Sequence, residues 1–113
     1  MPTFQTYKAA TLNTTTGTTL VTCGTGQHFL HSAYVANVYG SAMGITLKVQ
    51  HADTTVTYVA YKYKVFPNET VDLVKDNKIY LLTGDKLIAQ ADKADAFTIN
   101  VSLLDEANQW QLM

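Results

Sequence analysis

The sequence predicts an all-β fold, a single-domain antiparallel β-sandwich of jelly-roll-like type with eight or nine short strands. The first observation is composition. Among 113 residues there are seventeen threonines and seven tyrosines, residue types that suit a pleated, half-buried surface. The second is strict alternation of apolar and polar residues in several short runs. The third is a turn-forming pair about every ten residues. The length favours one domain. The alternation and turn patterns do not give the order of the strands, and they are also compatible with a β-barrel.

In the first half of the chain, four strands follow from these patterns. Tyr7 to Leu12 and Thr18 to Thr22 are separated by a turn at Thr16-Gly17. The run from His28 to Val38 is long and largely apolar on both faces, as expected for a central strand. Ile45 to Gln50 then alternates strictly, so it should have one buried face and one solvated face.

The second half of the chain shows the same alternation and turn residues. Val59 to Val65 alternates, with Val59, Tyr61, Tyr63 and Val65 on one face. The remaining predicted strands are Thr70 to Val74, Lys78 to Leu82, Lys86 to Ala91 and Phe97 to Leu103. Pro67-Asn68, Asp76-Asn77 and Gly84-Asp85 supply the turns between them. Asp92 to Ala96 could form no more than one helical turn, so no helix is predicted.

Charge and composition disfavour several classes of partner. All eight basic residues are lysines, and arginine is the preferred residue for recognising phosphate and guanine, so we expect no nucleic-acid partner. No apolar run approaches the ~20 residues of a membrane span, so we expect no membrane association. The N-terminal residues do not resemble a secretory signal. One cysteine cannot form a disulfide within the chain.

The stretch "VTCGTGQHFLH", residues 21–31, gathers the chain's only cysteine and two of its three histidines. His28 and His31 are three apart on one strand and should face opposite ways, which disfavours a shared metal ion. A four-residue hairpin over Gly24 to Gln27 would place Cys23 across from His28, and this adjacency stays open. "GTG" lacks the third glycine of a dinucleotide fingerprint. We therefore predict no catalytic, metal-binding or cofactor-binding residue, and no enzyme.

Three tyrosines close together, Tyr58, Tyr61 and Tyr63, form the clearest candidate surface. Tyr34, Tyr39 and Tyr80 could join them from other strands. Three interpretations of these side chains are open. They are ordinary strand aromatics with a hydroxyl at the rim, they contact a neighbouring subunit, or they form a platform for a sugar ring.

Both ends of the chain also carry apolar residues. The predicted N-terminal arm, about residues 1–8, has Phe4 and Tyr7, and the predicted tail, about residues 105–113, has Trp110 and Leu112. Untethered termini are usually polar. These ends should therefore fold back on their own domain or dock on a neighbouring chain, and we count the four residues as interface candidates.

The order of four segments adds a resemblance that covers roughly residues 5–106. They are "TTLVTCGTGQHFLHSAYVANVYGSAMGITLKVQ", "VFPNETVDLV", "IYLLTGDKLIAQA" and "FTINVSLLDEA". In this order they resemble small all-β virion proteins of tailed bacteriophages, especially phages of cyanobacteria. The chain departs from that pattern at Gly24 and His28, where proline and lysine are expected, and in its additional tail.

The resemblance implies a structural role in the phage particle and brings no catalytic residues with it. We expect a capsid decoration, or cement, protein on the outside of the head, made in the host cytoplasm. Its partners would be the major capsid protein or other virion proteins, and a homo-oligomer, with a trimer favoured. The alternatives are a neck, tail or fibre subunit, and a carbohydrate-binding module for host attachment.

Overall fold

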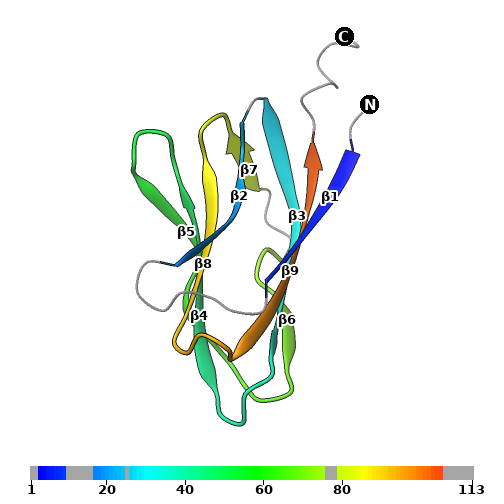
Figure 1. Cartoon of the computed structure of the whole chain (residues 1–113), viewed down its shortest axis with the longest axis vertical. Coiled ribbons are helices and arrows are strands. Elements are labelled where there is room, and N and C mark those ends of the chain that lie inside the picture. Colours follow the sequence, from blue (N-terminus) through cyan, green and yellow to red (C-terminus); the bar gives the residue numbers. More distant parts are fainter. Residues whose placement is uncertain (1–2, 10–16, 25, 76–78, 106–113) are drawn as a thin grey trace.

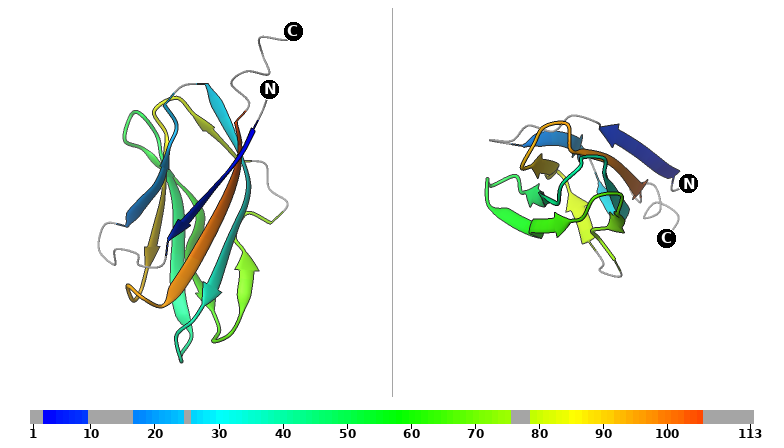
Figure 2. Two further views of the ribbon diagram at one scale, coloured as in Figure 1. Left: turned by 45° about the vertical axis from the view of Figure 1, so that its right-hand side comes forward. Right: turned by 90° about the horizontal axis from the view of Figure 1, so that it is seen from below.

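The computed structural model describes residues 3–9, 17–24, 26–75 and 79–105, with the side chains of residues 17–24, 26–75 and 79–104. This part of the chain is all-β and contains no helix, which confirms the predicted class. Two antiparallel sheets face each other in one compact domain (Figures 1 and 2). The first, sheet A, has the order β1-β9-β3-β6, and β7 also pairs with β3. The second, sheet B, has the order β2-β8-β4-β5.

The strand bounds agree closely with the sequence patterns except for the first strand. It begins at Thr3 instead of the predicted Tyr7, because residues 3–9 pair with the last strand, and residues 10–12 of the prediction lie outside the described residues. The first five strands are β1 (Thr3–Ala9), β2 (Thr18–Thr22), β3 (Gln27–Asn37), β4 (Met43–Gln50) and β5 (Val56–Val65). They are followed by β6 (Thr70–Asp72), β7 (Ile79–Leu82), β8 (Lys86–Ala91) and β9 (Phe97–Asp105). As predicted, β3 is central, with β9 on one side and β6 and β7 on the other. Most of the predicted N-terminal arm forms β1, which pairs with β9 over residues 3–9.

Strand pairing is nested around the β4–β5 turn. Working outward along the chain, β4 pairs with β5, β3 with β6 and β7, β2 with β8, and β1 with β9. Two further ladders, β3 with β9 and β4 with β8, complete the sheets. Neighbours along the chain therefore often lie in different sheets, as β2 and β3 do, or β7 and β8.

The core lies between the sheets and draws on both of them. Its largest fully buried side chains are Leu30, Val35, Leu81, Phe97, Val101 and Leu103 from sheet A, Ile45, Leu47, Val65 and Leu87 from sheet B, and Val74 from the segment after β6. Burying an aliphatic or aromatic side chain of this size stabilises a fold by roughly 1.5–3 kcal/mol. The alternation of β4 and β9 produces this core, because every second residue points into the space between the sheets.

Two turns marked by glycine in the sequence connect the two sheets and form no hairpin. The hairpin over Gly24 to Gln27 does not form, because β2 belongs to sheet B and β3 to sheet A. The turn at Thr83 to Lys86 exists, with Gly84 at a φ of 91°, but it carries the chain from β7 in sheet A to β8 in sheet B. Turn chemistry predicts where a chain reverses; whether the two strands then pair depends on tertiary packing.

Candidate functional site

A small open pocket on the outer face of sheet B is the first candidate site. We call it the tyrosine pocket; it is lined by Thr46, Tyr58, Tyr61, Lys62, Gln90, Ala91 and Asp92 and has a volume of about 180 Å³. The Tyr58 and Tyr61 rings meet edge to face with centroids 4.8 Å apart. The Lys62 Nζ atom lies 5.5 Å from the centroid of the Tyr61 ring. Aromatic surface and polar groups of both charge signs therefore meet in one recess.

Irregular pairing of β5 builds this pocket. The β4–β5 register shifts twice, between Ile45 and Leu47 and between Leu47 and Lys48, and such bulges redirect side chains. Lys62 has a φ of 48°, which is uncommon for a residue with a side chain. Its N–H donates to Thr46 Oγ1 at 3.0 Å. The outcome differs from the predicted alternation of β5, because Tyr61 and Tyr63 no longer share a face.

Tyr63 lies on the core side of β5, away from the tyrosine pocket. It is directly opposite Ile45, a fully buried core residue, and directly opposed residues of a ladder share a face. The Nζ atom of Lys75, from the segment after β6, lies 5.1 Å from the Tyr63 ring centroid. The bulges thus split the three predicted tyrosines into a pair and a single residue.

Asp92 reaches the rim of the tyrosine pocket because residue 44 is a glycine. The Gly44 N–H donates to Asp92 Oδ2 at 3.0 Å, and the Asp92 N–H donates to the Gly44 carbonyl, also at 3.0 Å. A Cβ atom at Gly44 would stand 2.8 Å from Asp92 Oδ2. This close approach fixes the carboxylate, while Oδ1 accepts no hydrogen bond from any described residue.

A second candidate surface is an exposed apolar tip at the lower end of the molecule in Figure 1, where the β3–β4 and β5–β6 turns meet. We define the apolar tip as Val38, Tyr39 and Phe66, with exposed fractions of 62%, 37% and 58%. The Lys93 Nζ atom lies 5.2 Å from the Tyr39 ring centroid. Large apolar side chains exposed together are typical of surfaces that bind another protein.

Asn37 holds the two loops of the apolar tip together. Its amide Nδ2 donates to the carbonyls of Val65 at 2.8 Å and Ser41 at 2.9 Å. Its Oδ1 accepts from the Tyr39 N–H at 2.8 Å, and its backbone pairs with the β5–β6 turn through Asn68 and Glu69. The side chain is almost fully buried, so the tip is a fixed surface rather than two independent loops.

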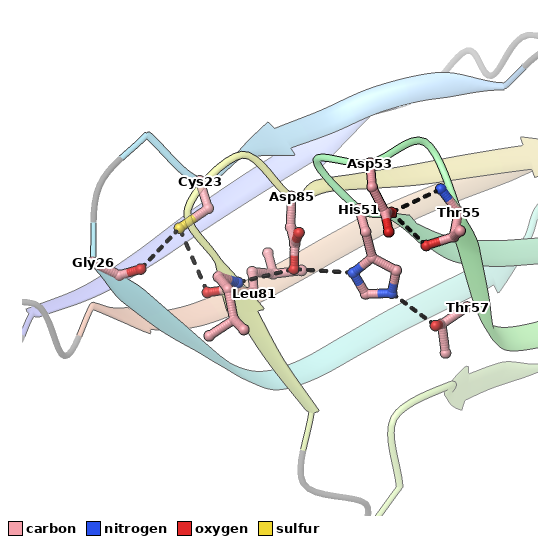
Figure 3. Close-up of polar contacts among 9 residues, drawn as sticks. Cys23, Gly26, His51, Asp53, Thr55, Thr57, Leu81 and Asp85 are labelled. Atoms are coloured by element: carbon pink, nitrogen blue, oxygen red, sulfur yellow. Dashed lines mark hydrogen bonds and ion pairs between the residues drawn. The ribbon is translucent and has the colours of Figure 1, made fainter.

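A carboxylate, an imidazole and a hydroxyl form a chain at the opposite end of sheet B (Figure 3). Buried Asp85 lies with Oδ2 3.3 Å from His51 Nδ1. His51 Nε2 lies 2.8 Å from Thr57 Oγ1. The order of groups matches that of a hydrolytic triad. Asp85 Oδ2 also accepts the Leu82 N–H at 3.0 Å, so the same contacts fasten the β4–β5 turn to the β7–β8 turn.

A shallow cleft of about 230 Å³ lies beside the contacts of Asp85, His51 and Thr57, between the edge strands β5 and β7. It is lined by Val49, His51, Thr57, Tyr58, Val59, Ile79 and Tyr80. Its lining is mostly apolar, and His51 and Thr57 are among its polar groups. Tyr80 stacks at a tilt against Phe29, with centroids 5.2 Å apart. Tyr80 therefore belongs to this cleft and not to the tyrosine pocket.

The residues of the "VTCGTGQHFLH" stretch are separated by the fold. Cys23 is buried, with Sγ 3.5 Å from the Leu81 carbonyl and 3.7 Å from that of Gly26 (Figure 3). His28 is opposite Leu81 and Asp105 in sheet A instead of opposite Cys23. His28 is buried, with no hydrogen-bond partner for Nδ1 among the described side chains and backbone groups, and His31 is exposed. Residues 17–24, 26–75 and 79–104 contain no group of three or more side chains suited to hold a metal ion.

The other predicted interface residues fall in different places. Tyr34, half-exposed, is on β3 in sheet A. Phe4 and Tyr7 are on β1, where the structure describes the backbone only. Trp110 and Leu112 lie outside the described residues. Among the predicted interface residues whose side chains the structure describes, Tyr58 and Tyr61 are in contact.

Sequence reasoning missed the residues that give these surfaces their geometry: Gly44, Asp92, Asn37 and Phe66. Phe66 did carry a signal, since a large apolar residue directly precedes the Pro67-Asn68 turn. Gly44 and Asp92 are 48 residues apart and meet only because β4 pairs with β8. No local pattern could have linked them.

The comparisons with known proteins add no relative. Protein-family models, curated proteins and solved structures were searched with the chain, and none of them gives a significant match. Within the described residues there is no helix long and apolar enough to cross a membrane.

Proposed function

We propose that this chain is a structural protein of a bacteriophage virion, a capsid decoration protein that binds the outside of the major capsid shell. Its sequence resemblance to small all-β phage virion proteins supports the proposal. The apolar tip of Val38, Tyr39 and Phe66 is the observation that carries it, because a fixed, exposed apolar surface on a small domain calls for a protein partner.

The strand order supports a jelly roll as the finer description of the fold. In a jelly roll, a long antiparallel hairpin is rolled so that its outer strands pair in two sheets, and nested pairing around the β4–β5 turn is what such rolling produces. Viral capsid domains and lectins both use this architecture. Fold alone does not establish function, so this similarity adds weight only beside the surface evidence.

Contact with the capsid would rest on surface burial. Phe66 and Val38 would insert between capsid subunits, and Tyr39 would contribute a ring and a hydroxyl, as tyrosines commonly do at interfaces. Each contact can be small, because many copies repeat it over a symmetric shell and a trimer would engage several sites at once. The trimer is part of the proposal, as are the major capsid protein as partner and the virion surface as location.

Quantitative mass spectrometry of purified particles of the encoding phage tests this function. Hundreds of copies per particle are expected for a decoration protein. A handful of copies would support the neck, tail or fibre alternative. Absence from the particle would overturn any structural role in the virion.

The apolar tip is tested by binding of the purified protein to particles that lack it. Phe66→Ser should reduce bound copies at least tenfold, because a central apolar contact often contributes 1.4 kcal/mol or more. Leu82→Ser is the matched control, since Leu82 is 55% exposed and lies on β7, at the other end of the domain. Equal binding by both variants would rule out the tip as the contact.

A further inference from the structure

We propose that the tyrosine pocket binds a single ring of a neutral carbohydrate. This would be a second activity beside the structural role, on a different surface from the apolar tip. The pocket lies on the outer face of sheet B, and the tip lies where the β3–β4 and β5–β6 turns meet. The argument uses the ring pair, the charges, the volume and the rigidity of the pocket.

The aromatic pair supplies a platform for the apolar face of a sugar. Tyr61 is 60% exposed and Tyr58 is 51% exposed, so both rings present surface to solvent although they pack against each other. Their edge-to-face contact restricts how either ring can rotate. Pockets for small molecules commonly join such aromatic surface to a few placed polar groups.

The polar groups suit hydroxyls, which both donate and accept hydrogen bonds. Asp92 offers a carboxylate acceptor held by Gly44, and Lys62 offers an ammonium donor. Thr46 Oγ1 accepts the Lys62 N–H, so its own proton remains available to donate. One positive and one negative charge nearly cancel across the pocket. A net anion or cation would be attracted by one of them and repelled by the other, so it gains little net attraction, whereas a neutral polyol can hydrogen-bond to both.

The volume sets the size of the ligand. The volume of the recess is about 180 Å³. Pockets for drug-sized molecules begin at roughly 300 Å³. One monosaccharide ring, free or at the end of a glycan, therefore fits the recess better than a longer stretch of polymer.

The pocket is organised before any ligand arrives. Gly44 leaves the space that Asp92 occupies, and the left-handed backbone at Lys62 turns Tyr61 and Lys62 toward the same recess. An unusual backbone conformation costs free energy and persists where the surrounding structure enforces it, often at binding sites. A fixed site loses less conformational entropy on binding, which favours weak ligands such as monosaccharides.

The test is an NMR titration of the ¹⁵N-labelled protein with glucose, galactose, mannose and N-acetylglucosamine, followed by glucuronate and inorganic phosphate. We expect at least one neutral sugar to shift the amide signals of residues 58–62 and 90–92, with a Kd on the order of 1 mM. No response to any of the four neutral sugars would overturn the proposal. So would a response to glucuronate or phosphate alone, which would indicate an anion site.

Matched variants locate the binding. Tyr61→Ala and Asp92→Asn should each weaken it at least tenfold, whereas Tyr34→Ala should leave it unchanged because Tyr34 is 51% exposed on sheet A. An unaltered spectrum elsewhere shows that each variant folds. Unchanged affinity in Tyr61→Ala would overturn the proposal. Phe66→Ser should lose particle binding and keep sugar binding, so the two proposals can fail separately.

Discussion

At the scale of single residues, the turn between β4 and β5 shows how a short side chain fixes local charge. Asp53 Oδ1 accepts the Thr55 hydroxyl at 2.6 Å and the Thr55 N–H at 3.1 Å. Because the hydroxyl stabilises the ionised carboxylate, it holds the pKa of Asp53 below its ordinary value of 3.8. Folding therefore favours the charged form of Asp53. Its contribution to stability is present above the unfolded-state pKa and is lost as the pH falls through the folded-state pKa.

Replacing Thr55 with Val should raise the pKa of Asp53 toward its ordinary value, since the hydroxyl donor is lost while the backbone donor remains. A ¹³C NMR titration of the side-chain carboxyl measures this directly. Thr98→Val, at an exposed position of β9, should leave the Asp53 titration unchanged. An unaltered pKa in Thr55→Val would show that the hydroxyl is not the cause.

The contacts of Asp85 and His51 follow the order of groups in a hydrolytic triad, but they also serve to stabilise the fold. The carboxylate is buried and accepts from the Leu82 N–H as well as facing His51 Nδ1. Burial of a charged group requires such partners. Each partner here belongs to a turn or strand end, so the contacts hold the two connections in register.

At the scale of elements, the loops of the apolar tip depend on one buried amide. Asn37→Ala would remove three side-chain hydrogen bonds and leave the carbonyl of buried Val65 without its donor. We expect a loss of about 3 kcal/mol in the free energy of unfolding, since a buried unsatisfied group alone costs about 1–3 kcal/mol. Urea denaturation followed by fluorescence measures it.

The control is Asn100→Ala, an exposed asparagine on β9, for which a change within about 0.5 kcal/mol is expected. Similar small changes in both variants would mean that Asn37 does not hold the tip together. If Asn37→Ala also weakens particle binding beyond its effect on stability, the fixed geometry of the tip contributes to the interface.

Strand β5 illustrates how an element can depart from its own pattern. Its alternation predicts that Tyr61, Tyr63 and Val65 share one face. Val65 is buried and Tyr63 is opposite Ile45 on the core side, but Tyr61 lies on the outer face. The bulge opposite Thr46 adds one residue to β5 and so reverses the faces on one side of it.

At the scale of the whole molecule, the nested pairing joins residues that are far apart in the sequence. β1 pairs with β9, and Thr3 is opposite Asp105. Closing such long loops costs chain entropy before any contact compensates for it. Nearly all of the sheet pairing has this non-local character, with β4–β5 the main exception.

We therefore expect slow folding, in milliseconds to seconds, as for other all-β domains with non-local pairing. Stopped-flow refolding from urea, monitored by tyrosine and tryptophan fluorescence, measures the rate. The thiol of Cys23 is kept reduced so that no intermolecular disulfide contributes a slow phase. Complete refolding within microseconds would contradict the nested topology.

The sequence by itself determined the all-β class, the position of nearly every strand and the sites of chain reversal. Alternation and turn residues act over a few positions, and they retain their meaning in any fold. Even the opposite exposures of His28 and His31 followed from their spacing. The tertiary structure alone decided which strands share a sheet, and this choice separated Cys23 from His28 and brought Gly44 to Asp92. It also placed the bulge that sets Tyr61 apart from Tyr63. The physical reason is that strand partners are selected by burial of the whole core at once, a condition that no short stretch of sequence contains.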